Sequence, residues 1–121
     1  MKVKFFLIML TLIACNTFAS IADKKESYQF HYESGDVYSV RLTKNTITWT
    51  GIAGSDKGIS ETDKLNRTKL SKNVHVLHWV ENSGMFVTVV FDHDTMKTIS
   101  SGIANHETWL MHGVAKDIKD S

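Results

Sequence analysis

The stretch 74–91, VHVLHWVENSGMFVTVVF, restricts the fold more than any other part of the chain. It consists of two apolar runs joined by the polar connection Glu81-Asn82-Ser83-Gly84. Side chains alternate between the two faces of a strand and glycine eases a tight turn, so this pattern predicts a β-hairpin. It is the longest apolar segment of this type after the N-terminal apolar run, and we expect the hydrophobic core to be built around it.

The alternation also assigns each side chain of the first run to a face. One face carries His75, Leu77, Trp79 and Glu81, and the other carries Val74, Val76, His78 and Val80. We expect the first set to point inward, which places a carboxylate at the end of a row that contains an aromatic ring. A shift of one residue in register would exchange the two faces. The outward set is itself rich in valine, which indicates that something covers the barrel there or that the assignment is weak.

Shorter alternating segments occur on both sides of this hairpin. We expect strands at 27–33, 37–42, 46–50, 96–103 and 108–114, and a poorly patterned one at 64–70. The segment 51–63 holds three glycines, which predicts a loop or a weak edge strand with bulges. Helical periodicity is absent from these segments.

Seven or eight short strands at this spacing are typical of sandwiches and barrels. Nearly every connection is short, which favours an up-and-down meander over a Greek key. The predicted fold is therefore all-β, an antiparallel up-and-down eight-stranded barrel, because closure removes exposed strand edges. A barrel of that size can hold one small ligand in its interior.

The N-terminus combines Lys2 and Lys4 with the apolar run FFLIMLTLIA, as in a secretory signal, and is too short for a comfortable membrane span. Two cleavage interpretations stay open. Leu12-Ile13-Ala14-Cys15 resembles a lipobox, which would end the signal at residue 14 and make Cys15 the lipidated first residue. Thr17-Phe18-Ala19 before Ser20 suits ordinary signal peptidase. The mass of the mature N-terminus separates the two.

We therefore divide the chain into a signal peptide at 1–19, a polar lead at 20–26 and one barrel domain at 27–121. The expected address is the bacterial envelope, periplasmic or lipid-anchored, or the medium. No cysteine remains in the barrel domain, so a disulfide framework is not expected there. Loss of the signal leaves 12 basic against 13 acidic residues, and nucleic-acid binders normally carry a basic surplus. Nucleic acid is therefore not an expected partner.

Candidate ligand-binding residues are six of the aromatic side chains on predicted strands, together with two polar residues of the hairpin. They are Tyr28, Phe30, Tyr32, Tyr38, Trp49, His75, Trp79 and Glu81. Such rings can line a concave apolar site, or they can simply fill the core of a small barrel. An inward Glu81 beside Trp79 would have a raised pKa and be a candidate acid or ligand anchor, whereas at a strand end it is equally a solvated turn residue.

Histidines do not predict a metal site. His75 and His78 are three residues apart on one strand and therefore lie on opposite faces. His93, His106 and His112 have no recognisable ligand spacing. Neither a phosphate-binding motif nor a nucleophile with an adjacent base is present. We expect no cofactor.

Several of these segments together resemble a known family. The residues are Phe30–Gly35, Val37–Val40, Thr48-Trp49, the loop with Gly54 and Gly58, His78–Gly84 and Val87–Asp92, of which Trp79-x-Glu81-x-x-Gly84 is the most specific. Over about 27–103 the chain resembles the MoaF-like branch of the calycin barrels. It is also similar to a short relative of the bacterial phenolic acid decarboxylases. The resemblance implies a calycin or lipocalin-like barrel.

The decarboxylase resemblance also implies catalytic positions. In that family a pair of tyrosines in the first strand, a Glu after the Trp and an Arg before the central hairpin are thought to act. Tyr32 and Glu81 match, but Phe30 stands at the other Tyr position, and Arg67 is out of register with the expected Arg. Half of the set is missing, including the cation that would hold a substrate carboxylate.

The sequence therefore predicts an exported barrel that holds a small, mostly apolar or aromatic molecule, and it favours a binding protein over an enzyme. A decarboxylase or lyase using Glu81 and Tyr32 in the same cavity is the alternative, and a filled barrel that serves as an interaction module is the third. An internal cavity would favour the first two.

Overall fold

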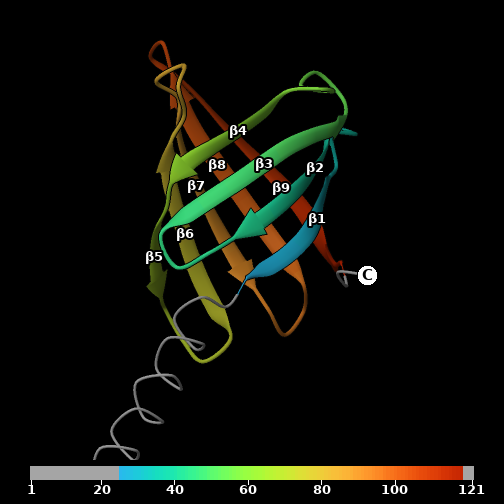
Figure 1. Cartoon of the computed structure of the whole chain (residues 1–121), viewed down its shortest axis with the longest axis vertical. Coiled ribbons are helices and arrows are strands. Elements are labelled where there is room, and N and C mark those ends of the chain that lie inside the picture. The colour runs from blue at the N-terminus through green and yellow to red at the C-terminus, as the bar shows by residue number, and fades with distance from the viewer. Residues whose placement is uncertain (1–24, 119–121) are drawn as a thin grey trace, which may run out of the picture.

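The computed structural model describes residues 25–118, and this part of the chain contains strands and no helix (Figure 1). The strands are β1 (Glu26–Tyr32), β2 (Val37–Leu42), β3 (Thr46–Ala53), β4 (Ser60–Lys64), β5 (Asn66–Lys69), β6 (Val74–Val80), β7 (Phe86–Asp92), β8 (Lys97–Ala104) and β9 (Glu107–Asp117). The predicted all-β class is confirmed.

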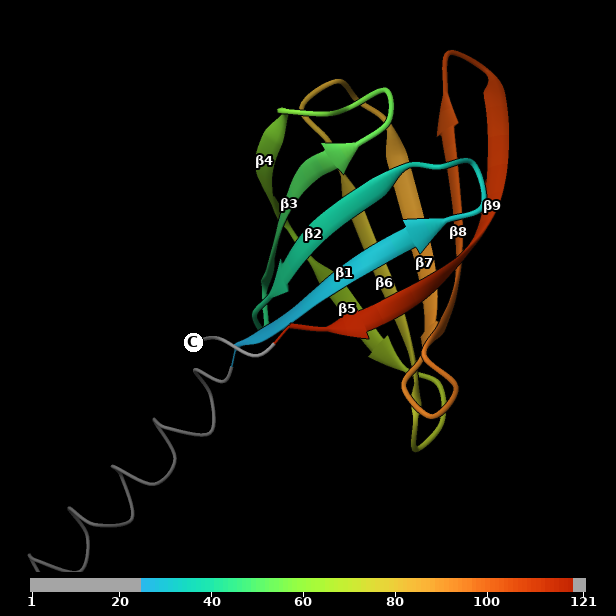
Figure 2. The same ribbon diagram turned by 90° about the vertical axis from the view of Figure 1, so that its right-hand side faces the viewer.

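The strands form one antiparallel sheet that curls into a nearly closed barrel (Figure 2). Its order is β4-β3-β2-β1-β9-β8-β7-β6-β5, so strands that follow one another in the chain are neighbours in the sheet, except β4 and β5, which form its two edges. The first and last strands also pair, with Phe30 opposite Ala115. This is the predicted up-and-down barrel, and the pairing of β1 with β9 satisfies two edges that would otherwise be exposed.

The structure has nine strands where eight were predicted, because one stretch of extended chain is divided between two partners. β4 pairs with β3, and β5 pairs with β6. Between them Leu65 turns its side chain into the core, where it is 3% exposed, and its N–H donates to the Asn45 carbonyl at 2.8 Å. The division leaves the sheet open between β4 and β5.

The predicted faces of the central hairpin are confirmed. Leu77 and Trp79 are buried inside the barrel, whereas Val80 is exposed on the outside. The connection 81–85 is closed by the N–H of Glu81, which donates to the Met85 carbonyl at 2.9 Å. Register therefore places the Glu81 side chain on the interior face with Trp79.

The interior is filled at one end of the barrel. Phe91 is fully buried there and packs edge to face on Tyr28, with ring centroids 5.0 Å apart, and on Phe30 at 5.5 Å. The same end holds Arg67, which pairs with Glu26 at 2.9 Å. In Figure 1 this end lies at the bottom, with the β5–β6 and β7–β8 connections.

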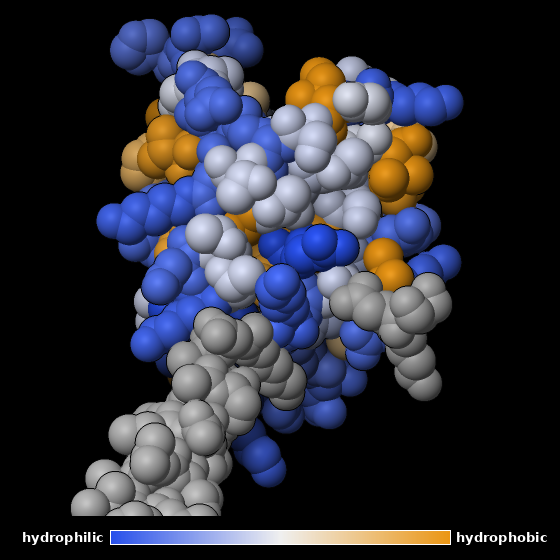
Figure 3. Space-filling model, viewed as in Figure 1, coloured by the Kyte–Doolittle hydropathy of each residue, from blue (hydrophilic) through white to orange (hydrophobic). Residues whose placement is uncertain are grey.

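The outside of β3 and β4 is polar. Hydroxyl pairs cross the two strands, Thr48 with Thr62 at 2.8 Å and Thr50 with Ser60 at 2.9 Å. Figure 3 shows this face as largely hydrophilic, with hydrophobic groups near its margins. Within residues 25–118 there is no helix long and apolar enough to cross a membrane. The predicted signal peptide and Cys15 lie outside the described residues.

Candidate functional site

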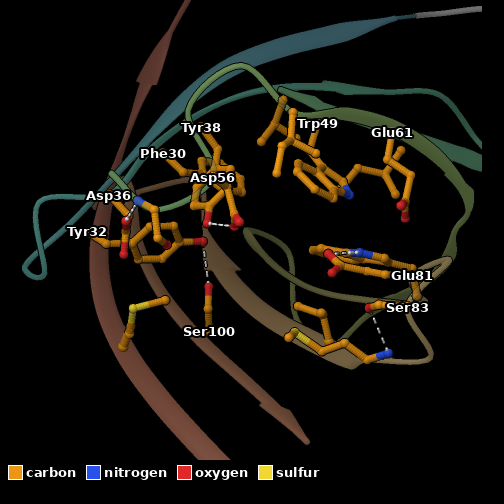
Figure 4. A pocket seen from close by; sticks show the side chains of 18 of the residues that line it. Phe30, Tyr32, Asp36, Tyr38, Trp49, Asp56, Glu61, Glu81, Ser83 and Ser100 are labelled. Atoms are coloured by element: carbon orange, nitrogen blue, oxygen red, sulfur yellow. Dashed lines mark hydrogen bonds between the residues drawn. The ribbon is translucent and has the colours of Figure 1, made fainter. Parts of the chain in front are cut away.

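A half-enclosed cavity of about 540 Å³ occupies the other end of the barrel (Figure 4). Its walls come from the ends of the strands and from three connections, β1–β2, β3–β4 and β6–β7. The lining residues are Phe30, Tyr32, Asp36, Tyr38, Val40, Ile47, Trp49, Ser55, Asp56, Ile59, Glu61, Trp79, Glu81, Ser83, Met85, Val87, Ser100, Trp109 and Met111. This volume is in the range of sites that hold small organic molecules.

One wall is a continuous series of aromatic rings. Phe30, Tyr32, Tyr38 and Trp49 follow one another edge to face, with centroids 5.9 to 6.5 Å apart. The alternation of β1, β2 and β3 points these side chains inward, and the antiparallel register brings Tyr38 opposite Phe30. Edge-to-face contacts fix the rings, so the wall is preformed.

The two tyrosine hydroxyls of this wall have partners inside the cavity. Tyr32 shares a hydrogen bond with Ser100 on β8, with 2.7 Å between the oxygens, and the Tyr38 hydroxyl donates to Asp56 at 2.5 Å. Burial raises the pKa of Tyr32 to about 12. Burial and the Asp56 carboxylate also raise the pKa of Tyr38. Both hydroxyls therefore stay protonated and add no charge to the site.

The β3–β4 loop is held against the mouth of the cavity. Its Gly54 lies so close to Asp36 that any side chain there would overlap the carboxylate, and the Ser55 N–H donates to Asp36 at 3.1 Å. At the base of the loop the Gly58 N–H donates to the Gly51 carbonyl at 2.9 Å. These contacts set the position of Asp56.

Two tryptophan–carboxylate pairs lie near each other where β4 approaches the end of β6. Trp79 Nε1 donates to Glu81 at 3.4 Å, and Trp49 Nε1 donates to Asp63 at 3.3 Å. Glu61 stands between them and accepts from the Asn82 N–H at 3.0 Å. Figure 4 shows Glu61 and Glu81 on the side of the cavity away from Asp36 and Asp56.

Burial raises the pKa values of two of these acids, Glu81 and Asp63. Burial is the main cause for Glu81, whose pKa rises to about 6, and the nearby charges of Glu61, Asp63 and Asp56 add to it. Burial and a hydrogen bond with Glu61 likewise raise the pKa of Asp63, which is 7% exposed. Near neutral pH the charged form of Glu81 is thus disfavoured by its surroundings.

Glu81→Gln is expected to stabilise the empty protein near pH 7.5. A pKa of about 6 in the fold exceeds the ordinary value of 4.5, so the contribution of Glu81 to stability is fully present below about pH 4.5 and is lost as the pH rises through 6. The gain is roughly 1 kcal/mol after allowance for partial exposure. Thermal melts of the variant and the unmodified protein near pH 7.5 and near pH 4.5 measure this gain.

The matched control for this change is Glu107→Gln, which removes the same charge from an exposed position at the start of β9. It is expected to leave the melting temperature nearly unchanged at both pH values. Equal effects of the two variants would show that overall charge, and not the setting of Glu81, is responsible.

The structure brings six of the eight predicted binding residues to one cavity. Phe30, Tyr32, Tyr38, Trp49, Trp79 and Glu81 line it. Tyr28 and His75 also point into the barrel, but they lie at its filled end. There Tyr28 packs on Phe91, and His75 accepts from Arg67 Nε at 3.0 Å and contacts the His93 ring. Arg67 is likewise remote from the cavity lining.

Sequence reasoning missed three lining carboxylates and one ring. Asp36 and Asp56 lie in turns, where no periodicity assigns a side chain to a face. Glu61, Asp63 and the buried Leu65 are two residues apart and therefore share the inner face of the chain, so the alternation over 61–65 was the available signal. Trp109 lies flat over Gly102, where a side chain would overlap its indole. In residues 25–118 no three His, Cys, Asp or Glu side chains are placed to hold a metal ion.

Comparisons with known proteins support the fold and show the family. A solved structure from Burkholderia vietnamiensis, provisionally described as a beta-lactamase, has the same fold with a TM-score of 0.72 at 10% identity, over 77% of this chain and 92% of that one. No protein with a curated description matches significantly in sequence. The profile of the MoaF-like family matches residues 24–116, almost the whole barrel. The predicted resemblance is confirmed, and the chain belongs to the MoaF-like family.

Proposed function

We propose that the protein binds one small, mostly apolar or aromatic molecule inside the barrel. The observation that carries this proposal is the cavity of about 540 Å³ with its preformed aromatic wall. A barrel whose rings merely filled the interior would leave no such space. The polar groups are few and converge on the cavity from its rim, which is the usual arrangement in small-molecule sites.

The three tryptophans supply a direct test. The chain contains only Trp49, Trp79 and Trp109, and all three line the cavity. Titration with the neutral dye N-phenyl-naphthylamine is expected to quench tryptophan emission and to raise dye emission, with saturation at one dye per protein. Native mass spectrometry of protein from its own host would then identify a co-purifying ligand.

Val87→Phe supplies the blocking variant for this titration. Val87 is buried on β7 and lines the cavity, so a larger side chain there takes space from the ligand, and dye affinity should fall at least about tenfold. The matched control is Val90→Phe on the other face of β7, which should leave dye binding unchanged. Absence of saturable binding by the unmodified protein, or equal binding by both variants, would contradict the proposal.

A decarboxylase reaction is the second candidate, and a single observation favours it: Glu81 has the raised pKa of a general acid. The lining residues described by the structure include no Lys, Arg or His to hold the carboxylate of an aromatic acid. The cavity therefore supports binding more strongly than decarboxylation. Release of carbon dioxide from hydroxycinnamic acids, lost in Glu81→Gln, would reverse this order.

A further inference from the structure

The cavity is strongly one-sided in charge. Four carboxylates line it, Asp36, Asp56, Glu61 and Glu81, with Asp63 buried directly behind. The described part of the lining contains no basic side chain to balance them. Charges at a poorly hydrated site interact more strongly than in bulk water, so this excess determines which ligands enter.

The four carboxylates differ in how well the protein satisfies them. Asp36 accepts from the Ser34 hydroxyl at 2.7 Å and from the Ser55 N–H at 3.1 Å. Asp56 accepts from Tyr38 at 2.5 Å, and Glu61 accepts from a backbone N–H at 3.0 Å. Within residues 25–118, the Glu81 side chain has only the long 3.4 Å contact with Trp79. Glu81 is therefore the carboxylate with the most capacity to accept from a ligand.

One aromatic ring contacts this carboxylate, and others line the same cavity. The indole N–H of Trp79 donates to Glu81. Trp49 lies opposite Glu61 in the pairing of β3 with β4, and the ring of Tyr38 packs edge to face on Trp49 with ring centroids 5.9 Å apart. The faces of indole and phenol rings attract cations, and the attraction increases when water is excluded. Rings and carboxylates that converge on one partly buried space suit a positively charged group.

We propose that the ligand is an organic cation, an amine or ammonium group carried on an apolar or aromatic body. Glu81, Trp79 and Trp49 hold the charged group, and the body lies along the wall of Phe30, Tyr32 and Tyr38. This assignment rests on the proposed function, since it names the chemical class of the molecule that the same cavity takes.

Proton linkage gives the site a characteristic pH dependence. Glu81 follows β6 and contacts Trp79 near the end of that strand. Burial opposes the ionisation of Glu81, and so do the charges of Glu61 and Asp63 on β4 and of Asp56 in the β3–β4 loop. A bound cation favours the ionised form. Affinity for a cation should therefore rise as the pH increases through about 6, whereas affinity for a neutral molecule should not.

Three probes with one phenyl skeleton test the proposal: phenethylamine as the cation, phenethyl alcohol as the neutral analogue and hydrocinnamate as the anion. Tryptophan quenching near pH 7.5 is expected to give at least about tenfold tighter binding of the amine than of the alcohol, and weakest binding of the anion. Between about pH 7.5 and 5 the amine should lose roughly tenfold in affinity and the alcohol little.

Glu81→Gln identifies the residue responsible. It should weaken amine binding roughly tenfold and change alcohol binding less than about twofold, while Glu107→Gln changes neither. Melting curves are used to check that both variants are folded. If the neutral dye binds but the amine is no tighter than the alcohol, or Glu81→Gln leaves the preference intact, the cation assignment is wrong and the binding function stands. If neither the dye nor any probe binds, the binding function itself is wrong.

Discussion

Phe91→Ala is expected to destabilise the protein by about 3–5 kcal/mol, a large part of the total stability of a domain of this size. Phe91 is 0% exposed and packs on three rings at the filled end of the barrel, those of Tyr28, Phe30 and His93. Its removal leaves a cavity that the closed sheet cannot collapse around. Urea unfolding followed by tryptophan emission measures the loss.

Phe86→Ala is the matched control, because Phe86 lies on the same strand but faces outward and is 45% exposed. It is expected to cost less than about 1 kcal/mol. The pair tests the interior assignment of β7, since a register shift of one residue would reverse the order of the two effects. Equal losses would indicate that the outer apolar face is covered by a partner in solution.

Side-chain parity predicted much of the barrel. The strand at 37–42 was predicted with the bounds that the structure has, and the inward row with Leu77 and Trp79 is the observed interior row. This works because one face of each strand must be buried, and a period of two then fixes every side chain. The short connections predicted the meander, and the need to remove exposed strand edges predicted its closure, which the pairing of β1 with β9 shows.

Parity does not fix the height of a residue along the barrel axis, and Tyr28 and His75 illustrate the consequence. Both point inward, yet they lie at the end away from the cavity. Height depends on the tilt and stagger of strands, which are properties of the closed barrel. Asp56 was missed for a related reason, since its position depends on contacts of the β3–β4 loop with Gly51 and Asp36 that no local pattern encodes.

Gly51→Val is expected to displace the β3–β4 loop, because a Cβ on Gly51 would overlap the backbone carbonyl of Asp56. Backbone cannot move aside as a flexible side chain does, so the loop must lift and give up the Gly58 N–H to Gly51 carbonyl hydrogen bond. We expect a loss of about 2–3 kcal/mol in stability. The Tyr38 hydroxyl should lose its bond to Asp56 at the same time.

The same change should weaken dye binding at least about fivefold, because Ser55, Asp56 and Ile59 leave the cavity rim together. Thr50→Val is the control. It alters the adjacent position of β3, where the side chain bonds Ser60 on the polar outer face, and should cost less than about 1 kcal/mol with dye binding unchanged. If Gly51→Val lowered stability but left dye and amine binding intact, the β3–β4 loop would stabilise the fold without forming part of the site.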